Sequence, residues 1–212
     1  MFSGIRALVF DLDGTLYTAQ GFAREVYRAA CAYAAGLTGT SQEAAESLVG
    51  AVKERLSRER GMEATLSSVC MELGGDVEGF HKAITPMVHP EEFLVRDELV
   101  VNLVRNLANR FDLYVYTNNN RILTDKILGI LGLSDLFRRV FTIEDFHRPK
   151  PDRDVLEKLF TAIGRSPEEC LFVGDRYDVD LRIPADMGSA VFLVKGVQEL
   201  LALALTNGET DC

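Results

Sequence analysis

The sequence has 212 residues, 47% of them hydrophobic and 26% charged, which is typical of a globular protein with one domain, or one domain and a small insert. Its formal net charge of −9 opposes nonspecific binding to nucleic acids and to anionic membranes, because both of those surfaces are negative. An anionic small molecule is compatible with this charge if its binding site is locally positive.

The first predicted element is a strand over residues 5–10, an uninterrupted apolar run that ends in two aspartates. Residues 18–96 follow without a convincing strand. Apolar residues recur there at helical spacing, and Ser41 is a candidate N-cap. We therefore predict a helical insert, in which Pro86 is a candidate end point for the last helix. The four predicted helical segments are 22–33, 45–56, 66–73 and 77–88.

A different pattern begins at residue 97. A helix over residues 97–110 is predicted to return the chain to the sheet, and four more apolar runs then alternate with helical patterns. Such alternation is typical of a parallel sheet with right-handed crossovers, whose strands are apolar throughout because both faces are covered. The predicted strands cover residues 113–117, 140–143, 171–173 and 190–194, and the predicted helices cover 123–131 and 155–163.

Two carboxylates follow the first predicted strand. Asp11 and Asp13 are two residues apart, so on an extended chain their side chains point to the same side. They repel each other unless a cation or a proton lies between them. Gly14 comes next and allows the chain to turn sharply. This pattern favours a chemical site over a solvated strand end.

Two further polar motifs follow predicted strands. Thr117 and Asn118 end one strand, and a hydroxyl with the backbone N–H groups after it can bind phosphoryl oxygens. Lys150 lies between two prolines, which stiffen the backbone and present the ammonium as a point charge suited to phosphate. Each motif is weak alone, because polar residues often follow strands and most lysines are exposed.

The last motif runs from Gly174 and Asp175 through Asp178 to Asp180, directly after a predicted strand. Hard oxygen ligands of this kind suit Mg²⁺. Asp178 also fits a simpler role at the start of a helix, where an acid complements the helix dipole. All four motifs fall at the carboxyl ends of predicted parallel strands, where open α/β sheets bind their ligands. The sequence therefore predicts a single site at this edge.

Together these motifs resemble those of the haloacid dehalogenase superfamily in its phosphatase branch, and the resemblance covers essentially the whole chain. The insert resembles the family's helical cap of the first type, as in phosphoglycolate phosphatases and pyrimidine nucleotidases. The resemblance implies an α/β fold with a Rossmann-like parallel sheet of about five strands in the order 5-4-1-2-3, flanked by helices. It also implies a catalytic core domain at residues 1–17 and 97–212 and a helical cap domain at residues 18–96.

The same resemblance implies Mg²⁺-dependent hydrolysis of a small-molecule phosphate monoester through an aspartyl-phosphate intermediate. Asp11 would be the nucleophile, and Asp13 would protonate the leaving alcohol and then deprotonate the attacking water. Mg²⁺ would be held by Asp11, the backbone carbonyl of Asp13, and Asp175.

The remaining roles implied by the resemblance concern the phosphoryl group. Thr117 and the Asn118 backbone would bind it, and Lys150 would neutralise charge on it and on the nucleophile. Asp180 would orient Lys150 or a metal-bound water, with Asp178 as the alternative acid for this position.

Other activities and the substrate stay open. A true dehalogenase resembles the chain less, because those enzymes lack the second acid, Asp13. A phosphomutase would keep all four motifs, and a catalytically silent binding protein on the same fold is a third alternative. Phosphoglycolate, a sugar phosphate and a pyrimidine nucleotide are candidate substrates by resemblance. The candidate residues for facing the substrate are Tyr17, Phe22, Arg24, Tyr27 and Arg121, whereas His81, His89 and His147 are expected at the surface or satisfied in the core.

The four cysteines form no C-x-x-C pair, and no histidine is spaced to complete a zinc site with them. They predict reduced thiols and a cytoplasmic location. No apolar run reaches the roughly 20 residues that span a bilayer. We expect a small phosphorylated metabolite as partner, no nucleic acid, no membrane, and a monomer or weak homodimer. The cysteines are Cys31, Cys70, Cys170 and Cys212.

Overall fold

The computed structural model describes residues 3–205, so Cys212 lies outside the described residues. Strand β1 (Ala7–Phe10) is the middle strand of a five-stranded sheet with the order β3-β2-β1-β4-β5. All neighbouring strands pair in parallel. The predicted fold class and strand order are therefore confirmed. The other strands are β2 (Asp112–Tyr116), β3 (Arg139–Phe141), β4 (Cys170–Gly174) and β5 (Ala190–Leu193).

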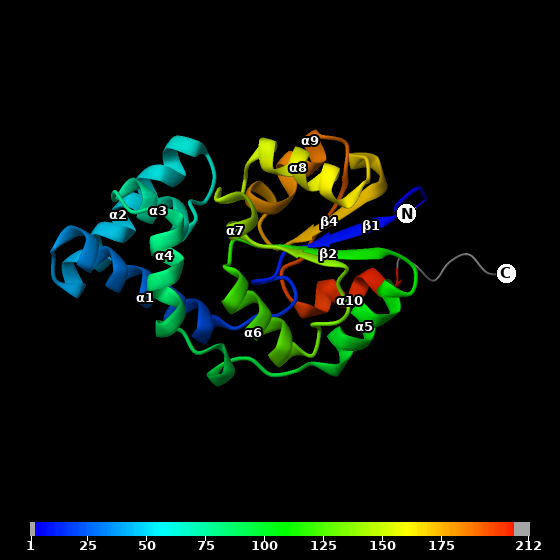
Figure 1. Cartoon of the computed structure of the whole chain (residues 1–212), viewed down its shortest axis with the longest axis horizontal. Coiled ribbons are helices and arrows are strands. Elements are labelled where there is room, and N and C mark those ends of the chain that lie inside the picture. Colours follow the sequence, from blue (N-terminus) through cyan, green and yellow to red (C-terminus); the bar gives the residue numbers. More distant parts are fainter. Residues whose placement is uncertain (1–2, 206–212) are drawn as a thin grey trace.

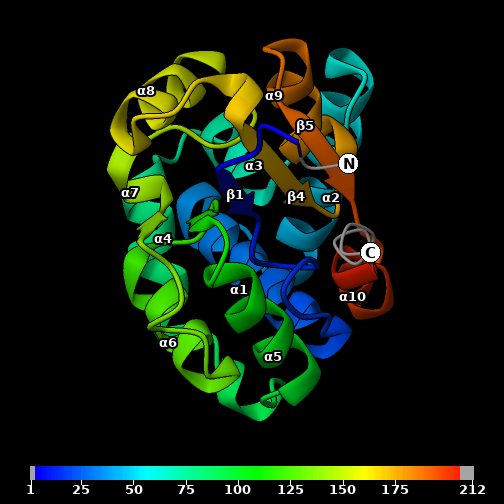
Figure 2. The same cartoon turned by 90° about the vertical axis from the view of Figure 1, so that its right-hand side faces the viewer.

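Helices cover both faces of this sheet, as Figures 1 and 2 show. Leu8 and Phe10 point into one apolar cluster, whereas Ala7 and Val9 point into another on the opposite face, because successive strand side chains alternate. The first face is covered by α5 (Glu98–Ala108), α6 (Arg121–Leu131) and α10 (Val197–Leu205), and the second by α7 (Ile143–Phe146), α8 (Arg153–Ile163) and α9 (Arg182–Asp186).

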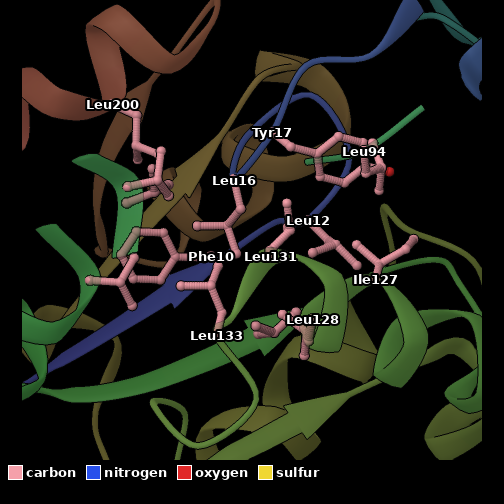
Figure 3. Packing of buried hydrophobic residues seen from close by; sticks show 14 of the residues in the cluster. Phe10, Leu12, Leu16, Tyr17, Leu94, Ile127, Leu128, Leu131, Leu133 and Leu200 are labelled. Atoms are coloured by element: carbon pink, nitrogen blue, oxygen red, sulfur yellow. The ribbon is translucent and has the colours of Figure 1, made fainter. Parts of the chain in front are cut away.

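The loop after β1 is anchored by its apolar residues. Leu12 and Leu16 are fully buried and pack in the same cluster as Ile127 and Leu131 of α6 (Figure 3). Each buried leucine contributes about 1.5–3 kcal/mol through the hydrophobic effect. The apolar positions of this loop thus hold it against the sheet, and the acids between them are presented at the sheet's edge.

Four α-helices between β1 and α5 lie to one side of the sheet (Figure 1). Cys31, Val49 and Leu56 belong to a separate apolar cluster within these helices. The predicted N-cap is present, because Ser41 Oγ accepts a hydrogen bond from the backbone N–H of Ala44 at 3.3 Å. The division of the chain into a core and a cap domain stays a prediction. The helices are α1 (Gln20–Thr38), α2 (Gln42–Arg60), α3 (Leu66–Glu72) and α4 (Val77–Ile84).

The structure differs locally from the predicted elements. The strand predicted over 140–143 ends at Phe141, because Thr142 and Asp145 form a reciprocal capping box that starts α7 at Ile143. The last helix of the insert ends before Pro86, as anticipated. Within residues 3–205, no helix is both long and apolar enough to span a membrane.

Candidate active site

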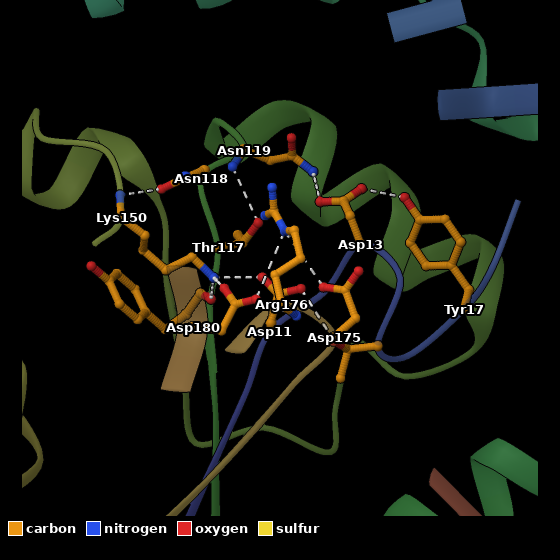
Figure 4. Close-up of polar contacts among 12 residues, drawn as sticks. Asp11, Asp13, Tyr17, Thr117, Asn118, Asn119, Lys150, Asp175, Arg176 and Asp180 are labelled. Carbon is orange, nitrogen blue, oxygen red and sulfur yellow. Dashed lines mark hydrogen bonds and ion pairs between the residues drawn. The ribbon is translucent and has the colours of Figure 1, made fainter. Parts of the chain in front are cut away.

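A buried lysine joins two aspartates at the carboxyl edge of the sheet (Figure 4). Lys150 Nζ donates hydrogen bonds to Asp11 Oδ1 at 2.5 Å, to Asp180 Oδ1 at 2.7 Å and to the Tyr116 carbonyl at 2.9 Å. Lys150 is 2% exposed and Asp11 is 5% exposed. The three bonds use all three donors of the ammonium, so its position is fixed from three directions.

Burial and charge act in opposite directions on this pair. Burial and the Asp180 carboxylate raise the pKa of Asp11 to about 7, against the lowering effect of Lys150 and Arg176. Burial alone would lower the pKa of Lys150, but Asp11 and Asp180 outweigh it and raise that pKa. The ammonium therefore stays charged at neutral pH. Asp11 carries full negative charge at neutral pH only if further positive charge comes close to it.

Asp13 faces away from Lys150 and has other partners. Its Oδ2 accepts a hydrogen bond from Asn119 Nδ2 at 2.7 Å, and its Oδ1 accepts one from the Tyr17 hydroxyl. Burial raises the pKa of Asp13, and the bond from Tyr17 opposes that rise. A carboxyl whose pKa lies above its usual range is better suited to give up and take back a proton near neutral pH.

The loops after β2 and before α8 are tied together beside Asp11. Asn118 Oδ1 accepts a hydrogen bond from the Lys150 backbone N–H at 2.7 Å. Thr117 is buried, and its Oγ1 accepts a hydrogen bond from the Asn119 backbone N–H at 3.1 Å. Asn118 Nδ2 is also buried and has no partner among the described residues. The predicted residues thus come together around one point, with an unused amide donor beside them.

Three carboxylates lie close enough to hold one metal ion. Asp11, Asp175 and Asp180 each offer an oxygen, and these oxygens lie within 4.8 Å of one another. Asp175 Oδ1 is buried and has no hydrogen-bond partner among the described residues. Burial is the main cause that raises the pKa of Asp175 to about 6. Both oxygens of Asp180 already accept hydrogen bonds, Oδ1 from Lys150 and Oδ2 from the Arg176 backbone N–H. Within the described part of the chain, Asp11 Oδ2 accepts only a long bond from Thr15 at 3.3 Å, so Asp11 and Asp175 are the carboxylates that best fit a hard cation such as Mg²⁺.

Gly14 is required by this arrangement for two reasons. Its φ of +85° is a conformation that side chains disfavour, and a Cβ at this position would overlap the Asp175 carboxylate. The sequence predicted the sharp turn at Gly14 but not the contact with Asp175.

Arg176 is a residue of this site that the sequence motifs did not predict. Its Nε lies 3.7 Å from Asp175 Oδ1 and 3.9 Å from Asp180 Oδ2, and its side chain is 33% exposed. No hydrogen bond joins its guanidinium to another residue in the described part of the chain. An arginine directly after Gly174 and Asp175 was the available signal. The site therefore contains a second cation with donors to spare.

The structure distinguishes the two candidate acids of the last motif, Asp178 and Asp180. Asp180 is buried beside Lys150, whereas the Asp178 side chain is 46% exposed and lies 3.7 Å from Arg182. A π-helical turn over Tyr177–Leu181 carries both residues and turns their side chains in different directions. Asp180 is thus the acid that contacts Lys150.

A cavity of about 370 Å³ opens above this edge of the sheet, between it and helices α1, α3 and α4. Tyr17 and Phe22 line it, as do Asp13, Asn119 and Arg176. The three other candidates for facing the substrate, Arg24, Tyr27 and Arg121, do not line this cavity. The Arg121 guanidinium instead donates hydrogen bonds to Asp145 and to the Val140 carbonyl.

The three histidines lie in different surroundings. His89 and His147 are exposed, as expected. The expectation that His81 is at the surface or satisfied is wrong, because His81 is buried, its Nδ1 has no partner among the described residues, and it lines the cavity.

Comparison with known proteins assigns the chain to a family. A family model described as haloacid dehalogenase-like hydrolase matches residues 5–188. The glyceraldehyde 3-phosphate phosphatase of Methanothermobacter thermautotrophicus is 25% identical, over 98% of this chain and 90% of its own length. The phosphoglycolate phosphatase of Photorhabdus laumondii is also 25% identical, over 99% of this chain and 88% of its own length.

A solved structure shares the fold. It is an enzyme of the same family from Bacteroides thetaiotaomicron, an aspartate-to-alanine mutant in complex with magnesium and inorganic phosphate. It superposes with a TM-score of 0.54 at 15% identity and covers 91% of this chain and 95% of its own.

Proposed function

The chain belongs to the haloacid dehalogenase-like hydrolase family, and we propose that it hydrolyses small phosphate monoesters, with Asp11 as the nucleophile. The observation that carries the proposal is that Asp11 and Asp13 lie in different environments. Asp11 is held by the buried ammonium of Lys150, whereas Asp13 faces the cavity with a raised pKa. One acid is thus arranged to attack, and the other to move a proton.

The reaction that we propose has two displacements. The Asp11 carboxylate attacks phosphorus, the bond from phosphorus to the ester oxygen breaks, and Asp13 gives its proton to the departing alcohol. Water then attacks phosphorus in the aspartyl-phosphate while Asp13 takes a proton from the water, and the bond from phosphorus to the Asp11 oxygen breaks. Inorganic phosphate leaves and the Asp11 carboxylate is restored. Tyr17 and Asn119 hold Asp13 in reach of the ester oxygen throughout.

We include Mg²⁺ as the cofactor, which Asp11, Asp175 and the backbone carbonyl of Asp13 would hold. The buried and unpartnered Oδ1 of Asp175 supports this set, as does the group of three carboxylates. The family member from Bacteroides thetaiotaomicron described above is a magnesium and phosphate complex. When bound, the ion would reduce the repulsion between Asp11 and the phosphoryl group and stabilise charge during transfer.

The phosphoryl group would be held by Thr117 and the Asn118 backbone, and the positive charge of Lys150 would attract it and neutralise part of its charge. Lys150 cannot rotate freely, because Asp180 and the Tyr116 carbonyl take two of its donors. Asp180 therefore acts as a positioning residue for the ammonium. Preorganised charge of this kind stabilises a transition state without reorganisation at the moment of reaction.

The relatives support the reaction class, because both are named as phosphatases of small metabolites. We also propose a cytoplasmic location, which is supported by the free and buried thiols of Cys31, Cys70 and Cys170. A monomeric or weakly dimeric state and the lack of nucleic-acid and membrane partners stay predictions.

The test is release of inorganic phosphate from an aryl phosphate with Mg²⁺ present, repeated after addition of a chelator. We expect turnover with Mg²⁺ and its loss on chelation. Acid quenching followed by mass spectrometry should find a phosphoryl adduct on the peptide that contains Asp11. Undiminished turnover in chelator would exclude the metal role, and an adduct elsewhere would exclude Asp11 as nucleophile. An adduct without phosphate release would favour the phosphomutase alternative.

A further inference from the structure

The wall of the cavity opposite the catalytic acids is largely apolar. Helix α1 contributes Phe22, Ala23 and Val26, and helices α3 and α4 contribute Leu66, Phe80 and Ile84. The polar side chains on this wall include Ser67 and His81, whose Oγ and Nε2 atoms lie 3.4 Å apart. A wall of this kind binds carbon surface and offers a few hydrogen bonds.

This wall carries no positive charge. Among the described residues that line the cavity, Arg176 is the sole arginine and there is no lysine. His81 adds no charge at neutral pH, because burial lowers its pKa to about 4. Glu63 is acidic and already pairs with Lys53 at 2.6 Å. Arg176 itself lies beside Asp175 and Asp180, at the end of the cavity where the phosphoryl group would be bound.

Binding of a second anionic group of the substrate at this wall would be unfavourable. The group would leave water for an apolar surface without gaining a cation, and Asp13 and Asp175 at the same cavity would repel it. An uncharged ring or chain would instead bind favourably, because it would remove the wall's apolar surface from water.

We propose that the cavity selects phosphate monoesters of uncharged alcohols with an apolar ring or chain, and discriminates against esters whose alcohol carries a second anionic group. The inference rests on the proposed function, since it places the transferred group against Asp11. Phosphoglycolate, with its carboxylate, falls outside this class.

The experiment compares benzyl phosphate, 4-carboxybenzyl phosphate and 4-carbamoylbenzyl phosphate with the Mg²⁺-loaded protein. The second and third esters have the same size, and they differ by one negative charge. We expect kcat/KM to be about tenfold or more lower for the carboxylate than for the carboxamide. Equal values, or a preference for the carboxylate, would overturn the inference.

A positive charge added to the wall should reduce this preference. Ala23 is exposed on α1, so Ala23→Lys adds a cation at the cavity with little effect on packing. We expect it to raise kcat/KM for the carboxylate relative to the carboxamide by about tenfold. The matched control is Ala51→Lys, an exposed position of α2 that does not line the cavity, and its ratio should equal that of the wild type.

Failure of the proposed function is distinguishable from failure of this inference. If none of the esters is hydrolysed, the phosphatase assignment fails, and the preference is read from calorimetric binding of the same esters to the Asp11→Asn variant. Weaker binding of the carboxylate than of the carboxamide supports the inference, and equal or tighter binding overturns it.

Discussion

The two sides of the cavity present opposite chemistry. On the sheet side, charges are paired at short distance, as between Lys150 and Asp11, which are 139 residues apart in sequence. On the side of α1, α3 and α4, the wall carries no cation among its described residues and is largely apolar. Parallel strands bring the ends of distant segments to one edge, so they can assemble a charged constellation. Packed helices present instead the side chains that also build their own core.

This difference assigns separate tasks to the two sides. Changes on the sheet side should alter rates and cation binding, because its residues would contact the reacting atoms. Changes on the helical side should alter the choice among substrates. We expect the largest effect at Asp11, and smaller effects with distance from it toward the helices.

Asp11→Asn tests the centre of the charged side. The amide is a poor nucleophile, so we expect kcat to fall by more than about 10⁴-fold. Stability should not fall, because the raised pKa of Asp11 means that burial of its carboxylate is unfavourable at neutral pH. Phosphate release and thermal unfolding without Mg²⁺ measure the two effects. Asp178→Asn is the control, an exposed acid of the same segment that should keep activity within about twofold.

Lys150→Met tests whether the ammonium serves both stability and rate. Its removal leaves Asp11 and Asp180 facing each other, which we expect to cost about 3–5 kcal/mol of unfolding free energy at neutral pH. Urea unfolding measures this cost, which should shrink at acidic pH as the carboxyls take up protons. We also expect kcat to fall by about 10²–10³-fold.

Lys126→Met provides the matched control for the stability effect. Lys126 pairs with Glu91 at 2.6 Å, but its side chain is 43% exposed. We therefore expect a loss of less than about 1 kcal/mol. Equal losses for the two variants would contradict the role of burial.

The sequence predicted the charged side better than the apolar one. The strand ends at Asp11, Thr117 and Asp175 are marked by polar residues directly after apolar runs, and the parallel topology then brings them together. Arg176 was missed because nothing in the order of residues indicates which way its side chain points. His81 was missed for a related reason, since helical spacing does not distinguish a side chain in the helices' own core from one at the cavity.

Arg176→Gln tests the second cation of the charged side. The guanidinium lies beside Asp175, so it should repel a cation held there. We expect its removal to tighten Mg²⁺ binding by about tenfold, which corresponds to about 1.4 kcal/mol. Calorimetric titration with Mg²⁺ at low salt measures the change. Arg176→Lys keeps the charge and should stay within about twofold of the wild type, whereas weaker binding by Arg176→Gln would mean that the arginine orients Asp175 instead.

Tyr17→Phe tests a residue that contacts both sides of the cavity. The Tyr17 hydroxyl donates to Asp13, and the centroid of its ring lies 6.4 Å from that of the Phe22 ring. The hydroxyl donates to the carboxylate form of Asp13 and so lowers its pKa. Its loss should raise that pKa by less than about one unit. In the proposed reaction Asp13 carries a proton when the ester bond breaks, so the basic limb of the kcat/KM profile should move to higher pH.

A matched control separates this effect from the loss of a hydroxyl as such. Tyr27 lies on α1 and does not line the cavity, so Tyr27→Phe should leave the basic limb of the kcat/KM profile at the same pH. A limb that moves to lower pH in Tyr17→Phe would mean that the hydroxyl favours the protonated form of Asp13. In that case the Tyr17 hydroxyl would accept a hydrogen bond from the protonated Asp13 carboxyl, and would stabilise the acid form that protonates the leaving alcohol.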